Sequence, residues 1–236
     1  QKIFYINNLV DDGTIFQSEW SRRQTIQENH KFSLKNQVIR NAPDPKIFFK
    51  KDLKEESLVS KKPRLMASSW SSNIMKGFEF FHYLDQTLDF SKYSMSFAGN
   101  IEKPFQNIQM LGQLNSHELA DELRQHDIFI FASERESCSN SLLEAMHSGL
   151  PVLCRNSSSN PEILGSGGLL FDNKSDMLKK LDILVRDYQI HKRNIYVKKI
   201  SEIFKEYMKF FSSLEPIHRK DKINFGKKLR YKFGLI

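Results

Sequence analysis

The stretch Ser133–Val152 holds the residues of this sequence whose types and spacing could do chemistry. It is expected to begin where a strand ends and a helix starts, which is where open α/β sheets bind their ligands. The small polar residues of its turn, Ser137, Ser139, Asn140 and Ser141, let the backbone approach a ligand closely. Since the first N–H groups of a helix have no partner within it, the turn predicts an anion site, and a diphosphate would suit it.

Two glutamates flank this turn. Glu136 lies within it, and Glu144 follows after seven intervening residues, about one and a half turns into the helix. A carboxylate can accept two hydrogen bonds from a ribose diol, and Glu136, which is nearer the strand, could instead face a sugar. Two glutamates at this spacing are more often an ordinary surface pair, so their interpretation depends on the sequence around them.

The elements that would position the turn follow a regular order. Short apolar runs alternate with helical patterns from Arg64 onward, which is typical of a parallel sheet covered by helices. About six strand–helix repeats are enough for one doubly wound α/β domain. Ser116 is expected to cap one helix, and Gly149 to end another. The predicted strands are 64–68, 94–98, 108–111, 127–132, 150–154 and 168–171, and the predicted helices are 76–88, 116–125, 139–147 and 177–187.

The chain divides into segments of different character. Residues 1–40 have a strand–helix–strand pattern of their own, which predicts the end of another α/β domain, and the two prolines of Asn41–Pro45 predict a linker. Because the chain begins with Gln1 rather than Met, we expect a fragment or a processed product. The expected segments are a domain end at 1–40, a linker and first helix region at 41–63, the sheet domain at 64–190, a helix at 191–213 and a basic tail at 214–236.

The composition excludes several classes of protein. Hydrophobic residues make up 39% and aromatic residues 12%, which excludes a disordered chain. No apolar run approaches the roughly 18 residues that a membrane-spanning helix needs. The two cysteines, Cys138 and Cys154, form neither a metal-ligand cluster nor a disulfide framework. We therefore expect a reducing, cytoplasmic setting.

The formal net charge is +8, from 36 Lys and Arg against 28 Asp and Glu. Such an excess favours anionic partners, namely phosphates, nucleic acid or an acidic membrane face, although an evenly spread excess is as often only a solvated surface. A nucleic-acid binder would need basic residues interleaved with aromatic ones on one face. Only the tail approaches that pattern, so nucleic acid is not an expected partner.

Several motifs follow one another in a fixed order along the chain. They are Glu136, Glu144, Ala145, Met146, Gly149, Pro151, Val152, Lys76-Gly77, Asn160–Ile163, Gly167-Gly168, Gln17-Ser18 and Val38–Asn41. Together they resemble the donor-binding half of glycosyltransferase family 4 and its relatives among the group 1 glycosyltransferases, which share the GT-B architecture. The resemblance covers nearly the whole chain up to about residue 210. It implies a Rossmann-like donor domain, a remnant of the acceptor-side domain at 1–40, and a terminal helix that crosses back to that domain.

The resemblance also implies roles for the residues. Lys76 would neutralise the diphosphate as it leaves, and Glu136 would contact hydroxyls of the donor sugar, so these two are the expected catalytic residues. Glu144 would hold the ribose. The turn Cys138–Leu142 would give backbone N–H groups to the diphosphate. The expected substrate-binding residues are Lys76, Gly77, Glu136, Cys138, Ser139, Asn140, Ser141, Leu142 and Glu144.

The expected reaction is transfer of a hexosyl unit from a nucleotide-diphosphate sugar, with retention of anomeric configuration, as in family 4. The sequence has no Asp-x-Asp motif, so we expect neither a metal ion nor a cofactor. The acceptor would be a glycan, a lipid or a protein. The basic tail would suit an anionic membrane, which would place the protein at the inner face of that membrane.

Three departures from the family pattern leave alternatives open. Ser71 stands where the family often has an arginine, Ser158-Ser159 where it usually has a glycine pair, and Ser137 where a glycine commonly follows the first glutamate. One positive charge at the diphosphate is therefore absent or supplied elsewhere. The main alternative is a non-catalytic module that binds a nucleotide sugar. An epimerase would need further acid and base groups, and the sequence shows no cluster of them.

Overall fold

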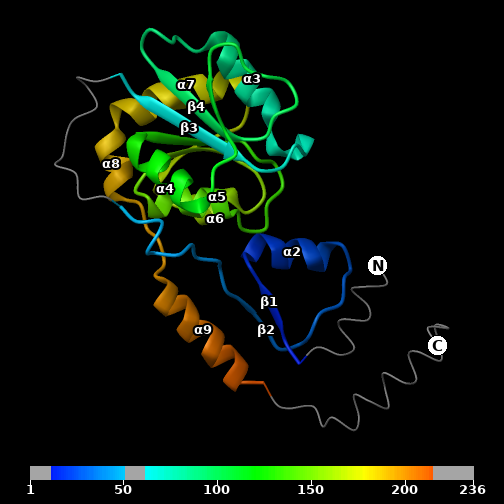
Figure 1. Cartoon of the computed structure of the whole chain (residues 1–236). Helices are drawn as coiled ribbons and strands as arrows, with labels where there is room; N and C mark the ends of the chain where they lie inside the picture. Colours follow the sequence, from blue (N-terminus) through cyan, green and yellow to red (C-terminus); the bar gives the residue numbers. More distant parts are fainter. Residues whose placement is uncertain (1–11, 51–61, 215–236) are drawn as a thin grey trace. The chain divides into compact units, whose positions relative to one another are not determined.

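The computed structural model describes residues 12–50 and 62–214, which Figure 1 draws in colour. The chain forms two compact units. One comprises residues 41–200, and the other joins residues 1–40 to residues 201–236. The division after residue 40 falls where the sequence changes character. The predicted basic tail lies outside the described residues except for Leu214.

The larger unit is built on one parallel sheet of six strands in the order β5-β4-β3-β6-β7-β8. Counted from β3 as the first strand, this is the doubly wound order 3-2-1-4-5-6, so the predicted α/β fold class is confirmed. The six predicted strands are all present within a residue or two of the expected bounds. They are β3 Arg64–Ser69, β4 Ser94–Gly99, β5 Gln109–Gly112, β6 Ile128–Phe131, β7 Val152–Arg155 and β8 Gly168–Phe171.

Helices cover both faces of this sheet (Figure 1). One face carries α3 Phe78–Thr87 and α7 Lys174–Arg186, and the other carries α4 Ser116–Gln125, α5 Asn140–His147 and α6 Asn160–Leu164. Strand β6 shows why helices pack on both faces of the sheet, because all four of its residues are buried. Ile128 and Ile130 join the core beneath α3 and α7, while Phe129 and Phe131 join the core beneath α4 and α5.

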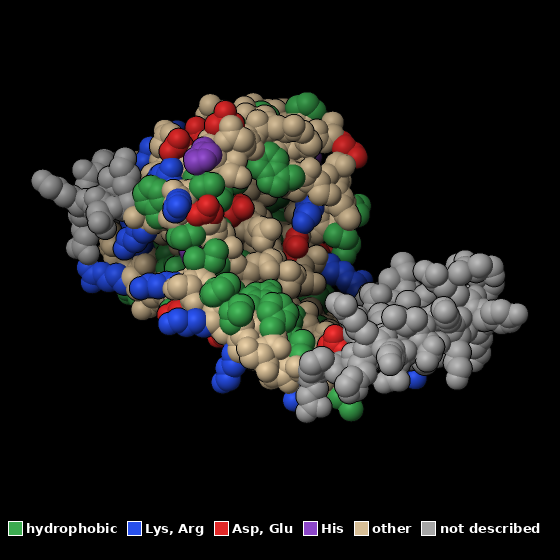
Figure 2. Space-filling model, turned by 60° about the horizontal axis from the view of Figure 1, so that its bottom comes forward, with side chains coloured by type: hydrophobic (Ala, Val, Ile, Leu, Met, Phe, Trp, Pro, Cys, Tyr) green, Lys and Arg blue, Asp and Glu red, His purple; other side chains and the backbone are tan. Residues whose placement is uncertain are grey.

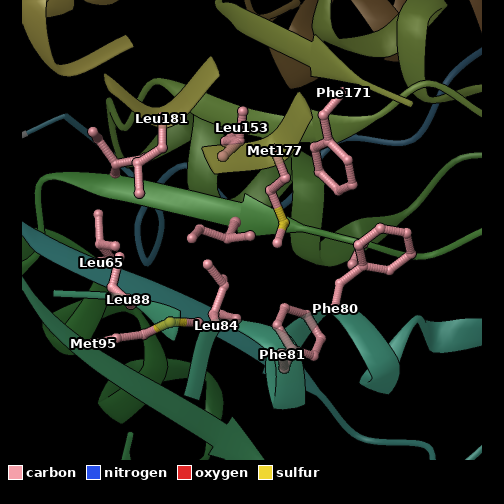
Figure 3. Close-up of a cluster of buried hydrophobic side chains, with 14 of the residues drawn as sticks. Leu65, Phe80, Phe81, Leu84, Leu88, Met95, Leu153, Phe171, Met177 and Leu181 are labelled. Carbon is pink, nitrogen blue, oxygen red and sulfur yellow. The ribbon is translucent and has the colours of Figure 1, made fainter. Parts of the chain in front are cut away.

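The core beneath α3 and α7 is drawn in Figure 3. Phe80, Phe81 and Leu84 enter it from α3, and Met177 and Leu181 enter it from α7. These side chains meet alternate residues of the strands, such as Leu65 of β3 and Leu153 of β7. The core holds α3 rigidly against the sheet, and so fixes the turn that leads into this helix.

The strand order places the two predicted site segments at one edge of the sheet. Strand β3 lies next to β6, and both are parallel, so their carboxyl ends meet. The chain leaves β3 toward α3 on one face, and leaves β6 toward α5 on the opposite face. Such a switch point opens a crevice beyond the strands, which is where doubly wound folds bind their ligands.

The predicted helix starts are wrong by two residues for α3, one for α5 and three for α7, whereas α4 begins at Ser116 as predicted. The cap of α4 is Asn115 and not Ser116, because Asn115 has extended backbone angles and its side chain accepts from the N–H groups of His117 and Glu118. The Glu118 side chain accepts in return from the Asn115 N–H, which completes a capping box. The helix expected from residue 76 begins instead at Phe78, because Gly77 has a left-handed backbone with φ of 75°.

The smaller unit contains strands β1 Thr14–Phe16 and β2 Asn36–Val38, which pair in parallel, and the helix α2 Glu19–Gln27 between them. This confirms the predicted strand–helix–strand pattern. Ser18 caps α2 in a reciprocal capping box with Ser21. The helix expected at 191–213 is α9 Ile200–Ser212, which begins nine residues later than predicted. The preceding short helix, α8 Tyr188–Arg193, belongs to the larger unit.

Within residues 12–50 and 62–214, no helix is both long enough and apolar enough to span a bilayer.

Candidate functional site

The turn before α3 brings Lys76 onto the end of β6. Residues Ile74–Lys76 form a single 3₁₀ turn, which begins where the Asn73 side chain accepts from the Met75 N–H at 2.9 Å. Gly77 follows, and a Cβ at this position would lie 2.2 Å from the carbonyl oxygen of Ala132. Only glycine permits both the left-handed backbone and this close approach. The turn is therefore pressed against the loop that follows β6, and Lys76 reaches that loop.

Glu136 lies in this loop and meets Lys76. The Lys76 Nζ donates to Glu136 Oε1 at 2.5 Å, and the Ser133 hydroxyl donates to the same oxygen at 2.6 Å. The two residues that the sequence predicts as catalytic are thus in direct contact, although 60 positions separate them along the chain. An ammonium group has three N–H donors, so this contact leaves two for an anion. Glu136 Oε2 has no hydrogen-bond partner among the described residues.

The first turn of α5 has the open N–H groups that the sequence predicts. Ser139 is the N-cap, but its side chain makes no capping bond and lies 3.0 Å from the Ser141 hydroxyl instead. The first backbone bond that closes the helix runs from the Leu143 N–H to the Ser139 carbonyl. The preceding N–H groups, those of Asn140, Ser141 and Leu142, are the ones that a helix cannot satisfy internally.

The side chains around these N–H groups are mostly inaccessible. Cys138, Ser139 and Leu142 are buried, whereas Asn140 is exposed and Ser141 is partly buried. The Asn140 Oδ1 accepts from Asn41 Nδ2 at 3.1 Å. The N–H groups of this turn and the positive end of the helix dipole are groups that can bind an anion.

Glu144 is the second predicted glutamate, and its environment is unusual. It lies on α5, is partly buried, and has no hydrogen bond or ion pair with the described residues. Burial raises the pKa of the Glu144 carboxyl to about 7. A desolvated carboxylate without a partner is unfavourable in a folded protein, and such groups concentrate at binding sites, where a ligand supplies the missing donors.

Ser71 supplies no charge to the site. Its hydroxyl accepts from the Asn73 N–H at 3.2 Å, and its carbonyl accepts from the Ser69 hydroxyl at 2.9 Å. These bonds shape the turn between β3 and Lys76. Arg155, at the end of β7, pairs with Glu134 at 3.4 Å and lies over the Phe80 ring. Its guanidinium is thus already committed to other partners.

Three residues at the site were not predicted from the sequence. Ser133 donates to the Glu136 carboxylate, Ser158 accepts from the Glu136 backbone N–H at 3.0 Å, and Asn160 donates to the Ser133 carbonyl at 2.9 Å. A signal for two of them was present, because Ser158 replaces a glycine of the family pattern and Asn160 precedes the Pro-Glu motif. Their contacts depend on the pairing of β6 with β7, which sequence spacing does not reveal.

No group of three or more His, Cys, Asp or Glu side chains that could hold a metal ion occurs in the described part of the chain. Cys138 and Cys154 are both buried and form no disulfide. Burial raises the pKa of the Cys154 thiol far above its ordinary range, so this thiol stays protonated.

Comparison with known proteins finds similarity to glycosyltransferases. Residues 101–201 match the family described as glycosyl transferases group 1. The sulfoquinovosyl transferase SQD2 of Arabidopsis thaliana is 33% identical over 97 residues, which are 37% of this chain and 19% of that protein. The resemblance to group 1 glycosyltransferases is thereby confirmed, and membership of family 4 stays a prediction.

Solved structures share the fold. A glycosyltransferase of Rickettsia africae matches with a TM-score of 0.71 at 14% identity, over 89% of this chain and 66% of its own. The Anabaena protein Alr3699/HepE, solved in complex with UDP, matches with a TM-score of 0.69 at 16% identity, again over 89% of this chain and 66% of its own. The chain thus spans less than two thirds of the length of these relatives. At such identities the likeness shows the fold alone.

Proposed function

With residues 101–201 assigned to the group 1 glycosyltransferases, we propose that this chain is the part of a glycosyltransferase that holds the nucleotide-diphosphate sugar. The observation that carries the proposal is the contact of Lys76 Nζ with Glu136 Oε1 at 2.5 Å, formed at the switch point of the sheet. This contact brings a cation and a carboxylate together at the loop that leads from β6 to α5.

The diphosphate would bind between Lys76 and the first turn of α5. Two remaining N–H donors of Lys76 and the N–H groups of Asn140, Ser141 and Leu142 would face its oxygens. Negative charge grows on the diphosphate as the bond to the sugar breaks, and preorganised donors stabilise that charge in the transition state. Because these donors belong to the protein, transfer would need no divalent metal.

The two glutamates would bind the two ends of the donor. Glu144, which is partly buried and has no partner among the described residues, would accept hydrogen bonds from the ribose diol. Glu136 has one oxygen held by Lys76 and Ser133, which leaves Oε2 for hydroxyls of the sugar. Glu136 would thereby orient the anomeric carbon for transfer of a hexosyl unit with retention of configuration. UDP is the first nucleotide to test, because Alr3699/HepE was solved with it.

The test is calorimetric titration of the 236-residue chain with UDP, GDP, ADP and their glucose conjugates, in magnesium and in a chelator. We expect one nucleotide to bind, with affinities in the two solutions that agree within about threefold. Glu136→Gln should lower only the affinity for the glucose conjugate. Glu134→Gln, two residues away in the same loop, is the matched control and should change neither affinity. Failure to bind any of these nucleotides would refute the proposal.

A second candidate is a module that binds the nucleotide sugar without transferring it. It is favoured by Ser71, which contributes hydrogen bonds to its turn but no positive charge. The chain also spans only 66% of the matched glycosyltransferase structures, so we expect it to transfer sugar poorly by itself. Incubation with a radiolabelled nucleotide sugar and candidate glycan, lipid and protein acceptors separates the two candidates, since robust transfer would exclude the binding module.

A further inference from the structure

The segment Ser157–Asn160 is bonded residue by residue to the loop that carries Glu136. The Ser157 hydroxyl donates to the Glu134 carbonyl at 2.7 Å, and the Glu136 N–H donates to the Ser158 hydroxyl at 3.0 Å. The Ser159 N–H lies 3.4 Å from the Glu136 carbonyl that accepts from it. These bonds join the turn after β7 to the turn after β6.

Asn160 anchors this segment to the sheet. It is fully buried, and its Nδ2 group donates to the carbonyls of Ser133 at 2.9 Å and Arg155 at 3.1 Å. Both partners are acceptors, so the orientation of the amide is fixed. Asn160 thus ties the end of β6 to the end of β7, and it holds the residue whose hydroxyl donates to Glu136 Oε1.

Ser158 makes the bond that acts on Glu136 itself. It is one of two non-glycine residues with positive φ among the described residues, and its φ is 50°. Glycine would adopt this conformation more readily but could not accept the Glu136 N–H. The side chain of Ser158 therefore adds a restraint on the Glu136 backbone that a glycine at this position cannot supply.

Together these contacts hold Glu136 from both sides. Lys76 and Ser133 fix its Oε1, while Ser158 fixes its backbone, and Oε2 alone is left for a ligand. We propose that Ser158 is a positioning residue that sets Glu136 for the donor sugar, an inference that rests on the proposed function. Its contribution belongs to the sugar and not to the nucleotide, because the diphosphate donors lie on Lys76 and α5.

The experiment compares the affinities of the full chain for UDP and UDP-glucose. Ser158→Ala removes the hydroxyl and keeps a side chain with positive φ, whereas Ser158→Gly removes the hydroxyl and relieves the backbone. Both variants should bind UDP within about twofold of the parent and should lose about fivefold in affinity for UDP-glucose, the effect of one hydrogen bond. Equal losses in the two variants would assign the effect to the bond rather than to backbone strain.

The matched control is Ser157→Ala, which removes a bond of the same kind that ends on Glu134. It should leave the ratio of the two affinities unchanged. The inference fails if the Ser158 variants lose the same affinity for UDP as for UDP-glucose, or if their affinity for both ligands is unchanged. It also fails if Ser157→Ala shows the same selective loss of affinity for UDP-glucose. If titration shows that the parent prefers GDP or ADP to UDP, that nucleotide and its glucose conjugate replace UDP and UDP-glucose in this experiment. If the parent chain binds none of the nucleotides and none of their glucose conjugates, the proposed function fails with this inference. If the parent binds both and the Ser158 variants match it, only this inference is overturned.

Discussion

At the scale of single residues, Glu144 is the group whose charge is most affected by folding. Burial raises the pKa of its carboxyl to about 7, so the folded chain holds this proton more tightly than the unfolded chain. The contribution of Glu144 to the free energy of unfolding therefore falls as pH rises from the ordinary range of a glutamate through 7. A ligand that donates hydrogen bonds to the Glu144 carboxylate would offset this cost.

We predict that Glu144→Gln has opposite effects on stability and on binding. The variant should be more stable than the parent at pH 8 and equally stable at pH 4, as measured by urea unfolding at both values. At pH 8 it should bind UDP more weakly, by roughly 1.5–3 kcal/mol, the range for a hydrogen bond to a charged group. In the parent, UDP should bind more tightly as pH rises through 7, with release of a proton. Weaker binding together with lower stability at pH 8 would contradict this assignment.

Lys76 gives a prediction that separates parts of the ligand. Lys76→Ala should weaken the binding of UDP by roughly 1.5–3 kcal/mol and leave the binding of uridine unchanged, because the nucleoside lacks the diphosphate. Lys92→Ala removes another paired lysine, bound to Asp89 at 3.2 Å, and should change neither ligand. Titration calorimetry with UDP and uridine measures both affinities. A similar loss for the two ligands in Lys76→Ala would mean general damage to the fold.

At the scale of elements, the site depends on how closely the turn before α3 approaches β6. Gly77 and Gly112 have nearly the same positive φ, 75° and 72°. A Cβ on Gly77 would lie 2.2 Å from the Ala132 carbonyl oxygen, whereas a Cβ on Gly112 would meet nothing within 4 Å. The two positions therefore share the conformational requirement and differ in the contact.

We predict that Gly112→Ala costs about 1 kcal/mol, the penalty of a left-handed backbone for a residue with a Cβ. Gly77→Ala should cost at least about 1 kcal/mol more, because the turn must move away from β6. That movement would separate Lys76 from Glu136, so Gly77→Ala should also weaken the binding of UDP, whereas Gly112→Ala should not. Urea unfolding and calorimetry measure these effects. Equal costs for the two variants would show that the close approach is unimportant.

At the scale of the whole molecule, all the residues of the candidate site lie in the unit formed by residues 41–200. The face drawn in Figure 2 carries hydrophobic, basic and acidic side chains intermixed. The net charge of +8 is therefore weak support for any one binding surface. The strongest clustering of charge in the sequence is the tail, where Asp221 is opposed by Arg219, Lys220, Lys222, Lys227, Lys228, Arg230 and Lys232.

We predict that this tail docks the protein on an anionic membrane, at its cytoplasmic face. Basic residues near such a surface contribute about 1 kcal/mol each, and aromatic residues among them, such as Phe225, Tyr231 and Phe233, can enter the interface. The full chain should pellet with anionic vesicles, and the pelleted fraction should fall when residues 216–236 are removed. Neutral vesicles are the control. Equal pelleting of the full and truncated chains would show that the tail does not contribute to membrane binding.

Much of the fold was determined by the sequence alone. The alternation of apolar runs with helical periodicity predicted all six strands of the large sheet. A strand buried on both faces, such as β6, is an apolar run wherever it lies, whereas the edge strand β5 is mostly exposed. Helix starts were less certain, since they depend on single residues. Asn115 and Ser116 are both good caps, and only the backbone angles of Asn115 decided between them.

Only the tertiary structure decided how the site is assembled. The sequence named Lys76, Glu136 and Glu144 by their motifs, yet it gave no reason for a lysine before α3 to touch a glutamate after β6. That contact exists because β3 pairs with β6, a choice of neighbours that no local pattern encodes. The bonds of Ser158 and Asn160 to the Glu136 loop likewise exist because β6 pairs with β7. The sequence determines which residue types are present, whereas the order of the strands in the sheet determines which of them come into contact.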